Sequence, residues 1–329
     1  MYEWTGDSTY LHDPCMTNFY DKSLNEYVER WKLQPDSIMH RPQFMNSPAE
    51  FDPHNNFHTC RGLASYVENF PGLTASADLI STLYAGHRAA AQIASARGNK
   101  QEQKRYENLA LQYRTLLEER WWNKEADGYQ TFWTTDQKFH RAEGESHILW
   151  FGVTEQPERI RATANHLLAK EWNIENQSYL PTLFYRLGYD EAAYKKLVSL
   201  PRMNRAEYPE VSFGVVEGVA GGAMGIQPSA SEGRITTLSR LPEQSGAKLK
   251  NVPVFGGYIT VEHNGRRRSS FTNHTGNPLL WRAAFHGEQS TARIANKEYK
   301  CEQDTDILGN TISYIEIEVP AGVTQIAEF

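Results

Sequence analysis

Apolar residues in the first two thirds of the chain recur at steps of three and four, which predicts amphipathic helices. One such face consists of Leu79, Leu83, Gly86, Ala90 and Ile93. Gly98-Asn99 follows as a C-cap, and a second face then runs over Tyr106, Leu109, Tyr113, Leu116 and Leu117. Two amphipathic helices joined by so short a turn predict an αα-hairpin.

The hairpin pattern recurs along the chain. ARGNKQEQKRYENLA from Ala96 and YRLGYDEAAYKKLV from Tyr185 both end a helix on glycine and begin another with polar residues, and WFGVTEQPERIRATANHLL from Trp150 is a looser copy. The marking glycines are Gly98, Gly152 and Gly188. A repeat length near 45 residues per unit predicts stacked helical hairpins, which form either an open solenoid or a closed toroid.

After Gln227-Pro228 the hydrophobic period changes from 3.6 to two. TVEHNGRRRSSF carries an Asn-Gly turn between alternating segments, and YIEIEVP alternates as a half-buried strand does. The sequence therefore predicts a helical domain over 1–228 and an antiparallel β-sandwich over 229–329.

Composition and charge exclude several function classes. The chain has 329 residues, a formal net charge of −6 and 22% charged residues of mixed sign, so no nucleic-acid partner is expected. No apolar run is long enough to cross a bilayer, and no signal peptide is visible. Three scattered cysteines favour neither a disulfide framework nor a zinc site. We expect no metal and no cofactor.

The stretch EYPEVSFGVVEGVAGGAMGIQP combines carboxylates with a run of glycines. The glycines, at 214, 218, 221, 222 and 225, are predicted to follow one stripe of a helix. Since each costs about 1 kcal/mol against alanine, a neighbouring helix or a ligand must need the close approach. Glu217 lies at the edge of the stripe, where it is either a partly desolvated acid–base group or a residue satisfied by helix packing.

Two other segments place carboxylates beside aromatic side chains. Glu207 and Glu210 bracket Tyr208-Pro209 in a predicted loop before the glycine-rich helix, where they are either catalytic groups or helix-start charges. MYEWTGDSTYLHDP holds Glu3, Asp7 and Asp13 around Trp4. Opposed carboxylates and an aromatic face are what glycoside hydrolysis requires.

Further polar clusters supply candidate substrate contacts. HRAEGESHILWFG places Glu143, Glu145 and His147 before a helix, either lining a sugar site or capping the helix. DPHNNFHTCRG clusters His54, Asn55, Asn56, His58 and Arg61. That second cluster suits a polysaccharide lyase, while a metal site there lacks a third ligand. Glu145, His147, His58 and Trp133 are taken as candidate substrate-binding residues.

EWTGDS resembles the acidic motif of the α-L-rhamnosidase family, and GVVEGVAGGAMGIQP is similar to the last helix of that family's toroid. The hairpins and the β tail also resemble the wider six-hairpin glycosidase superfamily. This resemblance implies a mainly α fold, an (α/α)6 toroid followed by an antiparallel β-sandwich. It also implies a sugar bound at the toroid mouth and cleavage that usually inverts the anomeric carbon.

The resemblance also implies roles for individual residues. Asp7 matches the motif aspartate, and Glu210 matches the family's base by position. The Trp-Glu-Arg-Trp context of that base and a following histidine are absent, so Glu217 stays an alternative. We therefore predict Glu210 as general base, Asp7 or Glu3 as acid and Glu217 as an orienting residue. Trp4 and Tyr208 are predicted to form the sugar platform.

Eight or nine helices are predicted, whereas a full toroid has twelve, so we expect the C-terminal portion of a longer enzyme. Its expected partner is an oligosaccharide or polysaccharide, and its localisation is either cytoplasmic or periplasmic or secreted. A polysaccharide lyase and a non-catalytic carbohydrate-binding protein are the alternatives. The sequence does not indicate an oligomeric state.

Overall fold

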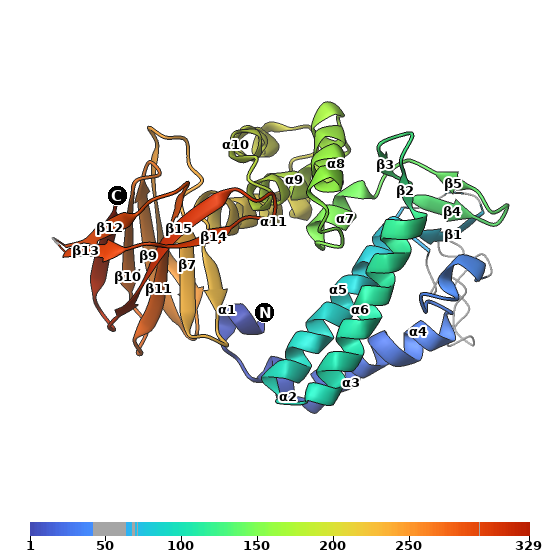
Figure 1. The fold of residues 1–329 in the computed structure, drawn as a ribbon, viewed down its shortest axis with the longest axis horizontal. Coiled ribbons are helices and arrows are strands. Elements are labelled where there is room, and N and C mark those ends of the chain that lie inside the picture. Colours follow the sequence, from blue (N-terminus) through green and yellow to red (C-terminus); the bar gives the residue numbers. More distant parts are fainter. Residues whose placement is uncertain (42–63, 68–69, 71, 296) are drawn as a thin grey trace. The chain divides into compact units, whose positions relative to one another are not determined.

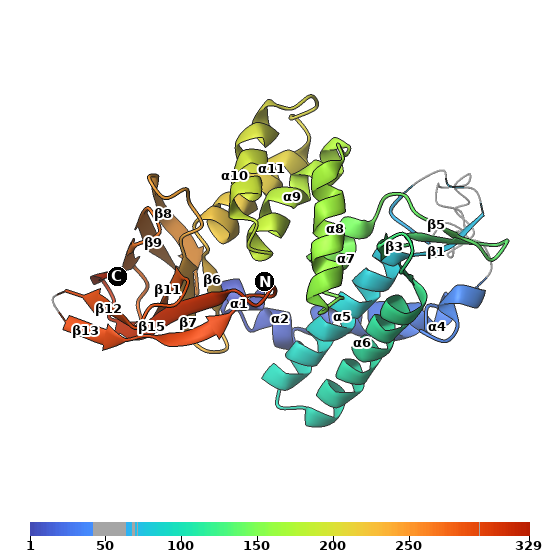
Figure 2. The same ribbon diagram turned by 45° about the horizontal axis from the view of Figure 1, so that its top comes forward.

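The computed structural model describes residues 1–41, 64–67, 70, 72–295 and 297–329 (Figures 1 and 2). The chain divides into two compact units. One is Leu11–Lys170, and the other combines Met1–Tyr10 with Glu171–Phe329. Helices give way to strands at Gln227. The two domains predicted to meet at 228/229 stay a prediction.

The Leu11–Lys170 unit is built on helical hairpins. It begins with α2 (Thr9–His12, which straddles the division between the units), α3 (Pro14–Asp21), η1 (Lys22–Glu26), α4 (Tyr27–Arg30) and η2 (Ile38–His40). Then come α5 (Ala77–Ala96), α6 (Lys100–Arg120), α7 (Glu145–Trp150) and α8 (Pro157–Ala169). Gly98 and Gly152 have φ of 74° and 61°, so the glycines that were predicted to end helices do occupy the left-handed conformation that the turns require.

Large side chains fill the interface between α5 and α6. The His87 ring of α5 stacks between Tyr106 and Tyr113 of α6, with ring centroids 5.9 and 5.3 Å away. Tyr113 is fully buried and its hydroxyl donates to the carbonyl of Leu33 at 2.8 Å. Leu117 and Trp121 continue the same buried stripe, as the helical period of apolar residues predicted.

Among the described residues, five short strands interrupt this helical region, which corrects the prediction that residues 1–228 are helical throughout. They are β1 (Leu73–Ser76), β2 (Trp122–Asn123), β3 (Gly128–Tyr129), β4 (Phe132–Thr134) and β5 (Phe139–His140). β1, β4 and β5 form one antiparallel sheet, and β2 pairs with β3. Phe132 and Thr134 are buried while Trp133 between them is only half-buried, so this segment has the two-residue period of a strand.

Glycines bring two helices of the second unit close together. The helices of this unit are α1 (Tyr2–Thr5), α9 (Ile174–Arg186), α10 (Asp190–Ser199), η4 (Leu200–Arg202), α11 (Pro209–Glu217) and η5 (Gly218–Ala223), a π-helix that continues α11. A Cβ atom added to Gly214 would lie 2.3 Å from the Ser178 carbonyl oxygen, and one on Gly222 would lie 2.5 Å from the Tyr185 ring. Later residues of α11 and η5 thus meet later residues of α9, so the two helices run parallel and begin at the same end.

Two sheets follow the helices. One has the strand order β13-β12-β16-β10-β9-β8 and the other β14-β15-β11-β7-β6, antiparallel except for the β7–β11 pair. Phe271 of β10 stacks on Trp281 of β11 with centroids 5.3 Å apart, which joins the inner faces into one sandwich core. The strands are β6 (Gln227–Ser229), β7 (Arg234–Leu238), β8 (Gly246–Val254), β9 (Gly257–Asn264), β10 (Arg268–Asn273), β11 (Leu279–His286), β12 (Thr291–Ile294), β13 (Lys297–Lys300), β14 (Glu302–Thr305), β15 (Thr311–Val319) and β16 (Thr324–Glu328).

Candidate functional site

Glu210 lies in the first turn of α11, not in the loop that we predicted. Pro209 occupies the N1 position, where its missing N–H costs no hydrogen bond, so the helix begins one residue before Glu210. Glu210 is half-buried. Because α9 starts at the same end, Glu210 shares that end of the helix pair with Glu175 of α9.

Tyr179 lies within electrostatic reach of these two carboxylates. Burial raises the pKa of its phenol, and the negative charges of Glu210 and Glu175 raise that pKa further. The charges of both carboxylates therefore act on the same phenol. The result is a half-buried cluster of two acids and a tyrosine where α9 and α11 begin.

Glu217 lies at the opposite end of α11, about 10 Å along the helix axis from Glu210. Its carboxylate pairs with Arg186 at 2.8 Å, and both side chains are a little under half exposed. Glycines of α11 and η5 pack against α9, which is the helix-packing alternative considered for this stretch. Glu217 does not take part in that close backbone contact. Gly221 has no atom within 4 Å of an added Cβ, and Gly225 lies beyond the end of η5. Of the five glycines predicted to form one stripe, Gly214, Gly218 and Gly222 therefore make the close helix contacts.

The acidic segment at the start of the chain is anchored to the sandwich. The Glu3 carboxylate accepts hydrogen bonds from the Ser231 backbone and hydroxyl at 3.3 and 3.2 Å, and the Trp4 carbonyl accepts from Phe255 N–H at 3.1 Å. Asp7 is exposed, and hydrogen bonds from Thr9 lower the pKa of its carboxyl group. A lowered pKa favours the ionised form, the reverse of what a general acid needs.

Tyr208 serves the packing of this unit. It is half-buried against the hydrophobic cluster of Ile174, Leu200 and Val211, and the Arg205 guanidinium lies 4.1 Å from its ring centroid. A cation already covers one face of the ring. A sugar platform at Tyr208 would therefore use the other face.

A second polar cluster lies in the Leu11–Lys170 unit, where α5 and α7 begin. Asp78, 5% exposed, accepts hydrogen bonds from the Ser65 hydroxyl at 3.1 Å and from the Tyr66 N–H at 2.9 Å. Gly144, at the start of α7, has φ of 109°, and a Cβ there would lie 3.7 Å from Asp78 Oδ1. The loop before α7 thus approaches the start of α5 closely.

Tyr66, Glu143 and His147 form the accessible rim of this cluster. The Tyr66 hydroxyl donates to Glu143 at 3.3 Å, and its ring lies 4.9 Å from that of His147. Burial lowers the pKa of His147, while the charge of Asp78 opposes that shift. Tyr66 is 43% exposed, so the cluster offers an aromatic face beside a carboxylate.

Glu145 is fully buried, which does not support its predicted contact with substrate. Arg141 Nε donates to its carboxylate at 2.6 Å, and the His166 ring contacts the other oxygen. A buried carboxylate with two such partners holds the start of α7 against the loop and α8. Glu145 therefore supports the rim residues without joining them.

Two further candidates have different outcomes. The Trp133 indole N–H donates to the Met39 carbonyl at 2.9 Å, and the ring packs on Phe139 in the core of the unit. That environment indicates a structural role in place of the predicted sugar contact. His58, with the neighbouring lyase-type cluster at 54–61, lies outside the described residues.

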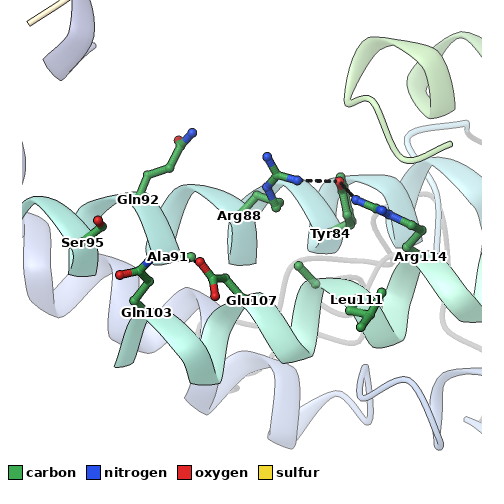
Figure 3. A pocket seen from close by; sticks show the side chains of 10 residues that line it. Tyr84, Arg88, Ala91, Gln92, Ser95, Gln103, Glu107, Leu111 and Arg114 are labelled. Carbon is green, nitrogen blue, oxygen red and sulfur yellow. Dashed lines mark hydrogen bonds between the residues drawn. The ribbon is translucent and has the colours of Figure 1, made fainter. Parts of the chain in front are cut away.

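A groove of about 400 Å³ lies along α5 and α6 (Figure 3). Arg88 and Arg114 both point to Tyr84, whose hydroxyl accepts from them at 3.1 and 2.8 Å. Arg114 also pairs with Glu155 at 2.6 Å. The two arginines thus share the Tyr84 hydroxyl, while Arg114 Nε is buried without a hydrogen-bond partner among the described residues. Glu107 is the one acidic residue that the structure describes in the lining, so no carboxylate pair there faces this groove.

The described residues also bear on metals and membranes. Across these parts of the chain, no cluster of three or more His, Cys, Asp or Glu side chains is placed to hold a metal ion. Within the same residues, no helix combines the length and apolar character that a membrane span requires.

Sequence reasoning did not identify Asp78, Glu175 or Tyr179 as site residues. Asp78 and Glu175 each follow a side-chain N-cap, Ser76 and Asn173, and acids are common there for electrostatic reasons alone. Such an acid can be recognised as a site residue only from the structure, which shows what other groups lie near the N-terminus of its helix. Tyr179 stands one turn into α9 with no distinguishing neighbour in sequence.

Comparisons with known proteins agree with this architecture. Residues 65–183 match the family model described as Trehalase, a range that begins at the Ser65–Asp78 cluster and ends within α9. No curated protein sequence matches the chain.

Solved structures extend the likeness to the whole chain. An α-L-rhamnosidase from Dictyoglumus thermophilum aligns at 13% identity with a TM-score of 0.60, covering 100% of this chain and 38% of that one. The GH78 family rhamnosidase of Bacillus sp. GL1 aligns at 12% identity with a TM-score of 0.56, covering 84% and 30%. A structure described as a sialidase aligns at 13% identity with a TM-score of 0.57, covering 99% and 32%.

The chain thus spans about a third of the length of each of these structures. Their helical toroid and sandwich correspond to the helical hairpins and the two sheets described above. The resemblance to the six-hairpin glycosidases is confirmed by the family model over residues 65–183, and the likeness of fold to these solved structures supports the α-L-rhamnosidase-like branch.

Proposed function

We propose that this protein hydrolyses glycosidic bonds of an oligosaccharide or polysaccharide, with inversion, and that its substrate resembles an α-L-rhamnoside. The observation that carries the proposal is the cluster of Glu210, Glu175 and Tyr179 where the parallel helices α9 and α11 begin. The glycosidase family match and the fold shared with α-L-rhamnosidases support it.

Glu210 is the proposed general base. A half-buried carboxylate at a helix start is held in place by its backbone and still reaches a water molecule. The tyrosine and the second acid beside it provide hydrogen-bonding groups for sugar hydroxyls. Glu217, about 10 Å away along the helix, is not placed for that water molecule.

Asp7 remains the proposed acid, under one condition. Its carboxyl group donates a proton only if substrate removes it from the Thr9 hydrogen bonds that now lower its pKa. Glu3 is the weaker choice, since Ser231 already binds its carboxylate through two hydrogen bonds.

The test is turnover of a panel of aryl glycosides that includes an aryl α-L-rhamnoside. Glu210→Gln should lower kcat by about 10²–10⁴ with KM nearly unchanged, because a general base contributes that much to the rate. Glu217→Gln on the same helix is the matched control and should keep near-normal turnover.

Three results would contradict the proposal. Near-normal turnover in Glu210→Gln would remove the assigned base. Product carrying the absorbance of an unsaturated uronate would identify a lyase. Binding without turnover of any glycoside in the panel would identify a carbohydrate-binding protein.

A further inference from the structure

A polar cavity of about 600 Å³ lies in the Glu171–Phe329 part of the second unit. The turn between α9 and α10 forms one side. The turn between β9 and β10, the end of β11 and the loop between β14 and β15 form the rest. The chemistry comes from six lining residues: Asp190, Arg266, His286, Glu288, Asp306 and Asn310.

Asp190, the first residue of α10, is the most buried acid of the cavity at 7% exposure. Its Oδ2 lies 3.0 Å from an Arg266 nitrogen and 3.5 Å from His286 Nε2. Its Oδ1 is buried and has no hydrogen-bond partner. A buried acceptor without a donor is costly, and burial raises the pKa of the Asp190 carboxyl group, so this side chain is stabilised when a hydrogen-bond donor reaches it or when it carries a proton.

The opposite side of the cavity is held rigidly by Asp306. Its Oδ1 accepts from the backbone N–H groups of Leu308 and Asn310 at 2.9 Å each, and its Oδ2 accepts from the Asn310 amide at 2.7 Å. A Cβ atom on Gly188 would lie 3.0 Å from Asp306 Oδ2. The helical turn and the sandwich loop therefore fit one another without a side chain between them.

The charges of the lining restrict the class of ligand. Among the lining residues, Asp190, Glu288 and Asp306 are opposed by Arg266, because burial, with Arg266 and Arg240 nearby, lowers the pKa of His286 to about 4 and leaves it neutral. Arg240, which does not line the cavity, adds a second positive charge near Asp190 and Asp306, so the acids still outnumber the cations. A negative lining disfavours phosphates and carboxylates. Among the described residues, no cluster of three or more ligating side chains here or elsewhere is placed for a metal ion.

Hydroxyl groups match what the lining offers. Each hydroxyl donates one hydrogen bond, which the carboxylates accept, and also accepts from a guanidinium or an amide. We propose that this cavity binds one neutral sugar unit of a glycan, at a site distinct from the Glu210 cluster. The proposal concerns binding alone and does not depend on hydrolysis.

The test is an NMR titration of the intact chain with four probes. Methyl α-L-rhamnoside and methyl α-D-glucoside are the neutral sugars, glucuronate is the acidic probe and glucosamine the cationic one. The neutral sugars should bind and glucuronate should not. All titrations are repeated in Glu210→Gln, where binding at the cavity should persist even though turnover is lost.

Asp190→Asn should weaken the neutral sugars by about tenfold or more, the effect expected on losing a hydrogen bond to a charged group. Glu288→Gln changes an exposed rim residue and should cause a smaller loss, which keeps the test valid if Asp190→Asn does not fold. Glu318→Gln, exposed on β15, is the matched control and should bind as wild type does.

The proposal is overturned if no neutral sugar binds, or if glucosamine alone binds. It is also overturned if Asp190→Asn, once shown to be folded, and Glu288→Gln both leave binding unchanged. Failure of the hydrolase proposal has a different signature, because it is read from turnover in Glu210→Gln and not from binding in the cavity variants.

Discussion

Two helix pairs in this protein pack by opposite means. Between α5 and α6 the contact is made by large side chains, with His87 stacked between Tyr106 and Tyr113. Between α9 and α11 the contact is made by backbone, because glycines of α11 and η5 face Ser178, Pro181 and Tyr185. Bulky side chains occupy the interface between α5 and α6, whereas the lack of side chains at the glycines lets α11 and η5 approach α9 closely.

The difference predicts opposite sensitivities. An interface built from large side chains loses stability when an atom is removed, since a cavity remains. An interface built on glycine loses stability when an atom is added, since the backbone must move. Close approach of α9 and α11 also brings their first turns together, so the candidate site depends on the glycine interface.

The largest effect is expected from Leu117→Ala. Leu117 is fully buried in the α5–α6 core, so the variant should lose about 3 kcal/mol of unfolding free energy through burial lost and cavity created. Leu111→Ala on the same helix is the control, because Leu111 is 54% exposed and should matter little. Chemical denaturation measures both, and equal effects would show that α6 does not pack as described.

Gly214→Ala should cost about 2 kcal/mol although alanine is the better helix former, because its Cβ would lie 2.3 Å from a carbonyl oxygen. Gly221→Ala, seven residues on, has open space and should be neutral or slightly stabilising. Denaturation curves of the two variants test the pair. If Gly214→Ala proves as stable as Gly221→Ala, the backbone contact between α9 and α11 is refuted.

His87 makes the aromatic interface dependent on pH. Burial, and then the charge of Arg105, lower its folded pKa to about 4 from an ordinary value of 6.5. Above pH 6.5 both states are neutral and the stability is complete. As the pH falls from 6.5 towards 4 the unfolded chain binds the proton first, so stability is lost, by about 1 kcal/mol between pH 7 and 5.5.

His87→Phe should keep the stacked ring and remove that part of the slope. Unfolding free energies of the variant and the wild type, measured over pH 5–7.5, give the comparison. His147, His263 and His286 also have pKa values lowered by burial, so some slope should persist. An unchanged slope in His87→Phe would contradict the burial of a neutral imidazole.

The smallest effect is expected from Glu217→Gln. Its ion pair with Arg186 is nearly half exposed, and such surface pairs contribute about 0–1 kcal/mol. Thermal unfolding at low and at high salt should show a small difference that salt removes. A loss well above 1 kcal/mol would mean that Glu217 belongs to the glycine interface after all.

The sequence predicted the hairpins and the sandwich because their signals are local. Gly98, Gly152 and Gly188 end helices in the left-handed conformation, and Asn264-Gly265 joins β9 to β10. The short strands β1–β5 were missed because strands of two to four residues have too few positions to display a period in the sequence, and β1 is buried at all four of its positions.

The candidate site was less predictable because it depends on which helices run parallel. No local pattern shows that Glu175 and Glu210 share one end of a helix pair, or that Asp78 meets the loop before Gly144. Burial also separates neighbours that look alike in sequence. Glu143 is half-buried on a rim, while Glu145, two residues later, is fully buried between Arg141 and His166.

The anchoring of the first ten residues has a consequence for biosynthesis. Glu3 and Trp4 bond to Ser231 and Phe255, so the unit that contains them closes over more than two hundred residues of chain. At about 5–20 residues per second, the ribosome needs roughly 10–50 s to make Phe255 after it has made Trp4. During that interval the acidic segment lacks its final partners, and it completes its unit only after the Leu11–Lys170 hairpins have been synthesised.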